Sequence, residues 1–150
     1  MDLRRKAVKF LDKHGYCTIS TINSESNTPQ STLVRYANDD LIIYLISAKE
    51  RRKVANIAIN PKVSIVVYGR SLLIPPKSLI IWGDATILDR DDDEAFRVYT
   101  SGRFPAGWIN SQAIRRAERR SNIVFIRIEP KKIRLNEYRN GFISGDVLEV

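Results

Sequence analysis

The stretch Ser78-Leu-Ile-Ile-Trp-Gly-Asp-Ala-Thr-Ile-Leu88 is the longest strand candidate in the chain. Gly83 lies inside it. A glycine within a strand is typical of a bulge, or of a bend at the corner of a barrel. The stretch therefore favours a small barrel.

The segments before this strand predict one amphipathic helix and three strands. Residues 2–14 form the helix, whose apolar face holds Leu3, Ala7, Phe10 and Leu11, and Gly15 supplies its C-cap. Residues 16–23, 30–37 and 41–46 then follow as strands joined by short turns. This order predicts an antiparallel meander.

The other segments predict short helices between further strands. A helix begins near Lys49 and ends at Asn60-Pro61, since proline disfavours helix in the residue before it. The remaining elements are strand 63–68, helix 91–99, a basic helix over 109–120, strands 122–128 and 133–138, and a short tail. The sequence thus predicts a mainly β fold with short helices: a six- to seven-stranded antiparallel β-barrel, closed or split, because closure removes exposed sheet edges.

Composition limits the classes of function. With 150 residues the chain is expected to form a single domain, 1–150. No apolar run is as long as a membrane span and the N-terminus has no signal-peptide core, so we expect a cytoplasmic protein without a membrane partner. A single cysteine and a single histidine exclude an internal disulfide and any familiar metal-ligand set.

Four cations gather where the helix after residue 48 begins: Lys49, Arg51, Arg52 and Lys53. The free N–H groups and the macrodipole of a helix N-terminus already attract anions. Cations at this point repel one another, which is easier to explain if an anionic ligand relieves the repulsion. The cluster predicts a phosphate site.

The net charge of +8 also points to an anionic partner, and several kinds fit it. A phosphorylated small molecule, a nucleic acid and a membrane surface all carry suitable charge. The basic helix over 109–120 suits a polyanion, but a solvated basic face explains it more simply. We expect no nucleic-acid function.

Several motifs in order resemble the pyridoxamine 5′-phosphate oxidase-like flavoproteins, over nearly the whole chain. The motifs are Pro29-Gln-Ser-Thr-Leu-Val-Arg35, Lys53-Val-Ala-Asn56, Asn60-Pro-Lys-Val-Ser64 and Ile81-Trp-Gly-Asp-Ala85. The resemblance implies an FMN-binding split β-barrel that forms a homodimer, with FMN in a cleft between the subunits. A related branch of the family binds the deazaflavin F420 instead.

The resemblance also implies cofactor-binding residues on the first half of the chain. Thr32, Leu33 and Val34 match the strand whose backbone faces the flavin ring, and Arg35 matches a cation near the phosphate. Ser47 matches a hydroxyl at the end of the next strand. Arg52 and Lys53 match a basic pair that binds the FMN phosphate.

Three further positions are implied with different roles. Asn56 matches a residue that supports the helix or contacts the surroundings of the ring, and Ser78 and Trp82 fall on the strand that approaches FMN from the other subunit. Each residue also has a simple structural interpretation, such as an N-cap for Ser47. The apolar segment 72–76, together with Trp82 and Trp108, is expected to form the dimer interface.

The departures from the family limit the activity. Gln30 stands where a true oxidase of this family has arginine, and Asn136 stands near the position of a tryptophan. We therefore expect a flavin-dependent oxidoreductase of a small-molecule redox substrate rather than a vitamin B6 oxidase, and no residue is assigned a catalytic role. An F420-dependent reductase and a non-catalytic module that binds flavin or nucleic acid remain as alternatives.

Overall fold

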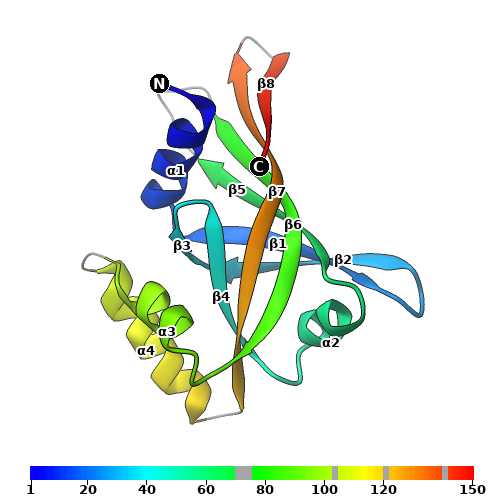
Figure 1. Cartoon of the computed structure of the whole chain (residues 1–150), viewed down its shortest axis with the longest axis vertical. Helices are drawn as coiled ribbons and strands as arrows, with labels where there is room; N and C mark the ends of the chain where they lie inside the picture. The colour runs from blue at the N-terminus through cyan, green and yellow to red at the C-terminus, as the bar shows by residue number, and fades with distance from the viewer. Residues whose placement is uncertain (70–75, 103–104, 120–121, 140–141) are drawn as a thin grey trace.

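The computed structural model describes residues 1–69, 76–102, 105–119, 122–139 and 142–150. Its elements follow the chain in this order: α1 (Leu3–Lys13), β1 (Tyr16–Asn23), β2 (Thr28–Arg35), β3 (Ala37–Asp39), β4 (Ile42–Ala48), α2 (Arg52–Ile59), β5 (Lys62–Gly69), β6 (Lys77–Asp89), α3 (Asp93–Thr100), α4 (Ala106–Glu118), β7 (Ile123–Arg139) and β8 (Phe142–Glu149). The strands form one antiparallel sheet, which confirms the mainly β fold (Figure 1).

The two longest strands, β6 and β7, run side by side through the whole molecule (Figure 1). The strand order is β2-β1-β5-β6-β7-β4-β3, and β8 pairs with β7 beside this path. Among the described strands, β2 and β3 end the path and do not pair with each other. The sheet is therefore a barrel that stays open, as the split-barrel prediction requires.

The core lies in two parts on the sheet. The larger part fills the barrel with fully buried side chains such as Ile19, Ile65 and Ile81, and α1 packs against it through Ala7 and Leu11. The smaller part lies under α3 and α4, around Tyr44, Tyr99 and Phe125. Cys17 belongs to the larger part, where burial raises the pKa of its thiol to about 12 and leaves it an inert apolar group.

The bend predicted at Gly83 is present. The register between β6 and β7 shifts between Trp82 and Gly83, because Trp82 pairs with Lys132 while Gly83 pairs with Pro130. A Cβ on Gly83 would stand 2.3 Å from the Glu129 carbonyl oxygen. Glycine is thus needed at this position, because a Cβ would clash with the neighbouring backbone.

The predicted break over 129–132 is wrong, because β7 continues through Pro130. Before this residue β7 pairs with β4 as far as Ile128, and after it β7 pairs with β8 from Lys132. Pro130 lies where the partner strand changes, so its missing N–H costs little in the ladder. The expected tail is itself a strand, β8.

The predicted meander is also wrong. β2 pairs with β1, but β4 pairs with β3 and β7, on the far side of the sheet. Tyr36 and the short strand β3 carry the chain across the open side of the barrel. Local turn signals cannot show this crossing, because strand neighbours are set by distant contacts.

The helix ends differ in detail from the prediction. α1 ends at Lys13 with His14, rather than Gly15, as its C-cap, and α2 begins at Arg52 with Arg51 as its N-cap, so Ser47 is not the N-cap. α4 begins at Ala106. Residues 72–75 of the expected interface segment lie outside the described residues. Within the described part, each helix is too short or too polar to cross a bilayer.

Candidate functional site

The N-terminus of α2 carries cations and lacks the usual caps. Arg51 occupies the N-cap position without a side-chain hydrogen bond to the helix, and the first turn contains no acidic residue. Lys49, Arg51 and Arg52 are exposed. The free N–H groups of this turn and the cations beside them attract an anion together.

Lys53 differs from its neighbours because it is half-buried. Burial, and then the charge of Arg51, lower the pKa of Lys53 from its ordinary value. A bound phosphate would oppose both effects. Of the four cations, Lys53 is thus the one whose charged form a bound anion would stabilise most.

Asn56 attaches α2 to the sheet. Its carboxamide is almost fully buried, and Nδ2 donates to Thr21 Oγ1 at 3.0 Å and to Gln30 Oε1 at 2.8 Å. These bonds connect the helix to β1 and β2. Of the two roles implied for Asn56, the structure shows the supporting one.

Strand β2 presents an unused backbone edge. It ends the sheet and pairs only with β1, so its outer N–H and C=O groups are not used in strand pairing. Thr32 and Leu33 are exposed, while Val34 packs against the barrel core. A flat ligand can therefore reach the backbone of these three residues.

Arg35 is held at the other end of β2 from Gln30. Its Nε donates to Asn110 Oδ1 at 3.0 Å, and its Nη1 donates to Tyr16 Oη at 2.9 Å. The guanidinium also lies over the Tyr16 ring. Since a strand rises about 3.3 Å per residue, Arg35 lies roughly 16 Å along β2 from Gln30, which is the β2 residue that contacts α2.

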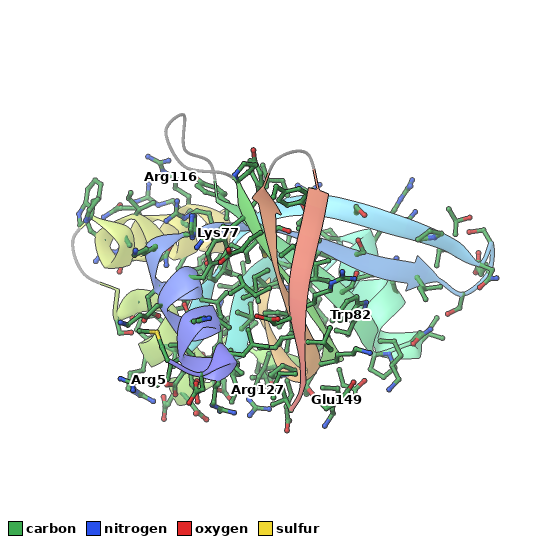
Figure 2. All side chains as sticks on the ribbon, turned by 90° about the horizontal axis from the view of Figure 1, so that it is seen from above. Arg5, Lys77, Trp82, Arg116, Arg127 and Glu149 are labelled. Atoms are coloured by element: carbon green, nitrogen blue, oxygen red, sulfur yellow. The ribbon has the colours of Figure 1, made fainter. Side chains whose placement is uncertain are left out.

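The side chains of Ser47, Ser78 and Trp82 lie in three different environments. Ser47 is buried at the end of β4, where its hydroxyl donates to the Ala48 carbonyl oxygen. Ser78 is buried beside Asn136, whose Nδ2 donates to Ser78 Oγ at 3.4 Å. Trp82 is partly exposed, under the Lys132 ammonium, and Figure 2 places it away from α4 and Arg116.

The structure thus groups the predicted residues in parts. α2 holds Arg52, Lys53 and Asn56. The hydrogen bond from Asn56 to Gln30 keeps β2, with its unpaired backbone edge, beside this helix. Sequence reasoning missed Gln30, Thr21, Tyr16 and Asn110 as partners of the site residues. Their side chains are uncharged, and only the pairing of distant strands and helices brings them into place.

The arrangement fits a cofactor with an anionic end and a flat end. The anionic end suits the cation cluster of α2, and the flat end suits the open backbone edge of β2. His14 is the only histidine of the chain. Its Nδ1 forms a hydrogen bond with the Phe10 carbonyl oxygen at 2.7 Å, and its ring packs against the Phe10 ring in a tilted arrangement. Among the described residues no group of ligands for a metal ion is present.

Among the solved structures of similar fold, some are named after a ligand and others are not. General Stress Protein 26 from Bacillus anthracis is 19% identical over 100% of both chains, with a TM-score of 0.72. An FAD-binding protein from Mesorhizobium loti is 20% identical over 93% of both chains, with a TM-score of 0.70. HutZ, the heme storage protein from Vibrio cholerae, is 17% identical over 87% of this chain and 91% of its own, with a TM-score of 0.65.

A comparison with curated proteins found no match. The family described as pyridoxamine 5′-phosphate oxidase does match, over residues 3–137, which run from α1 to the second half of β7 and include α2, β2 and the bend at Gly83. The match therefore covers the open barrel together with the cation cluster and the free strand edge, and the chain belongs to the pyridoxamine 5′-phosphate oxidase family.

Proposed function

We propose that the chain is an FMN-binding flavoprotein that acts as a flavin-dependent oxidoreductase on a small-molecule substrate. The observation that carries the proposal is the N-terminus of α2, where exposed cations and the half-buried Lys53 surround an uncapped helix start. The cluster suits a phosphate, and FMN ends in one. Family membership supports the same cofactor.

In this proposal the residues of the chain bind and orient the cofactor. Arg52 and Lys53 hold the phosphate, with the guanidinium of Arg52 suited to a bidentate contact. The edge of β2 faces the ring through the backbone of Thr32, Leu33 and Val34. Arg35, for which the resemblance implied a place near the phosphate, lies toward the ring end in this proposal, because it is far along β2 from α2. When bound, the flavin supplies the hydride or electron transfer.

A second subunit completes the cleft in this proposal. The face of the sheet turned away from the barrel core carries exposed apolar side chains from β2, β5 and β6: Leu33, Val66, Tyr68 and Trp82. Leu33 pairs with Thr18, and Thr18 pairs with Val66, so these side chains share one face.

An apolar sheet face of this extent suits a subunit interface. Leu33 is 69% exposed and Tyr68 is 57% exposed, so large apolar side chains on this face are open to solvent. A second copy of the chain would cover them by a twofold contact. We expect a homodimer, with Trp82 of one subunit near the cofactor of its partner.

The proposal is tested by adding cofactor to the apo protein. Purified protein with bound flavin is yellow, and FMN fluorescence is expected to change on titration with apo protein. Tight binding of F420 in place of FMN would favour the F420-dependent reductase, in which Lys49 and Arg51 meet a longer anionic tail. A protein that binds neither ligand would contradict the proposed function.

A further inference from the structure

Helix α4 is fixed to the rest of the molecule by one face. Gly107, Asn110 and Ile114 are buried, and Ile114 belongs to the smaller part of the core. Asn110 Nδ2 donates to the Tyr99 carbonyl oxygen at 2.8 Å, and Asn110 Oδ1 accepts from Arg35. A Cβ on Gly107 would collide with the backbone at the end of α3. These contacts fix which face of α4 is turned to solvent.

The solvent face of α4 carries a tryptophan and a row of arginines. Trp108, Arg115 and Arg119 follow one another by seven and four residues, which places them along one side of the helix. All three are exposed, and Trp108 exposes 58% of its surface. Arg116 is exposed beside this row, and Figure 2 shows it pointing away from the body of the molecule. We call Trp108, Arg115, Arg116 and Arg119 the α4 stripe.

The arginines of the α4 stripe are available to another molecule. None of the three takes part in an ion pair among the residues that the structure describes. α3 and α4 run antiparallel (Figure 1), since Asn110 near the start of α4 bonds to Tyr99 near the end of α3. The start of α3, with the exposed carboxylates of Asp93 and Glu94, therefore lies beside the later turns of α4. The two helices present a surface with both signs of charge.

This surface suits a protein better than other anionic partners. A helix that lies on a bilayer buries an apolar face in it, whereas the apolar face of α4 is packed in the core and the α4 stripe has one large apolar side chain, Trp108. The phosphates of a nucleic acid would meet the carboxylates of α3 as well as the arginines. A protein surface can match both signs of charge. Tryptophan and arginine are also enriched among the residues that dominate binding between proteins.

We propose that the α4 stripe binds a second protein through an acidic surface with an apolar pocket. Carboxylates of that partner pair with Arg115, Arg116 and Arg119, because the guanidinium fork suits a bidentate contact with a carboxylate. The apolar pocket receives the ring of Trp108. This inference does not rest on the proposed function, because no residue of the α4 stripe is assigned to the cofactor.

The test uses a labelled peptide as a substitute for the acidic surface. The probe is a fluorescein-labelled helical peptide with one row of glutamates and one row of leucines, followed by fluorescence anisotropy at low salt. We expect wild type to bind it, and the triple variant Arg115→Glu, Arg116→Glu, Arg119→Glu to bind it at least about tenfold more weakly. Trp108→Ser is expected to weaken binding by about tenfold as well, because the ring is lost from the pocket.

A matched variant separates the α4 stripe from the net charge. The triple variant Arg5→Glu, Lys6→Glu, Lys9→Glu makes the same change in net charge at exposed positions on α1, and is expected to weaken binding much less. The same peptide with lysine in place of each glutamate should bind the α4 triple variant better than wild type. Thermal unfolding of each variant reports any loss of fold.

Two further probes test the other kinds of partner: single-stranded oligothymidine, and vesicles of phosphatidylcholine and phosphatidylserine in equal parts. Loss of the acidic peptide in the α4 variants, with the fold intact and the α1 variant little changed, supports the inference. Failure of wild type to bind the peptide overturns it, and so do equal losses in the two triple variants. Tighter binding of oligothymidine or vesicles through the same residues would assign the α4 stripe to a nucleic acid or a membrane instead.

Discussion

At the scale of single residues, Lys53 has the most decisive position. It is half-buried beside Arg51, and both burial and this neighbour lower its pKa. An ammonium placed this way is destabilised in the free protein and gains from an anion. Two predictions follow, one for binding and one for stability.

Lys53→Ala is expected to weaken FMN binding. Loss of one charge-assisted contact to the phosphate costs about 1.5–3 kcal/mol, which corresponds to roughly a ten- to hundredfold higher Kd. The measurement is a fluorescence titration of both apo proteins with FMN and with riboflavin. Riboflavin should bind both about equally. Equal FMN affinity would mean that the cations of α2 are only a solvated helix start.

Lys53→Met is expected to make the apo protein more stable near neutral pH. A lowered pKa means that the folded state disfavours the charged lysine, so the cost is present below the folded pKa and disappears as the pH rises through it. The gain in Tm of Lys53→Met should therefore be largest near pH 7 and shrink at alkaline pH. A gain that grows with pH would contradict the lowered pKa.

The residues of the site were only partly predictable. Arg52 and Lys53 were found because charge gathers before an apolar helix, which is visible in the sequence. Gln30 and Asn110 give no such signal, since a neutral amide becomes informative only through its partner. Nothing in the sequence indicates that Tyr16 and Asn110 hold Arg35 at the far end of β2.

Among the elements, β6 and β7 approach each other closely because Gly83 has no Cβ atom. A Cβ at position 83 would stand 2.3 Å from the Glu129 carbonyl oxygen, and backbone on both sides cannot yield easily. By contrast, a Cβ on Gly15 would meet its nearest neighbour at 4.0 Å. The two glycines form a matched pair.

Gly83→Ala is expected to lower the free energy of unfolding by about 1–3 kcal/mol or more, as over-packing does. Gly15→Ala is expected to change it by no more than about 0.5 kcal/mol. Urea unfolding followed by circular dichroism measures both. If Gly83→Ala were as stable as Gly15→Ala, the close approach of β6 to Glu129 would not be present in solution.

Most elements could be predicted because their signals are local, whereas their arrangement could not. The strands 16–23 and 63–68 and the bend at Gly83 follow from apolar runs and a single glycine. The break predicted around Pro130 was wrong. A proline usually ends a strand, but this one lies within β7, where the partner strand changes. The position of β4 beside β7 depends on residues far apart in the sequence.

At the scale of the whole molecule, the exposed apolar sheet face predicts a dimer. Light scattering of wild type at micromolar concentration is expected to give twice the 17.2 kDa of one chain. Val66→Glu places a charge on the sheet face and should give monomers. Phe96→Glu, at an exposed position on α3, should remain dimeric. A wild-type mass of one chain would remove the second subunit from the proposed cleft.

The net charge of +8 predicts only weak binding to DNA. Contacts of scattered cations with phosphates release counterions, so affinity for random duplex DNA should fall steeply as salt is raised. Fluorescence anisotropy at two salt concentrations measures this. Nanomolar, sequence-selective binding that survives salt would favour a nucleic-acid function over the flavoprotein proposed here.

The place of β7 in the sheet has a consequence for synthesis of the chain on the ribosome. β4 and β6 both pair with β7, which comes after both of them in the chain. Until β7 emerges, one edge of each of these apolar strands has no partner and invites pairing with other nascent chains. The sheet is therefore expected to form only after β7 has been made, and the chain to need protection from aggregation until then.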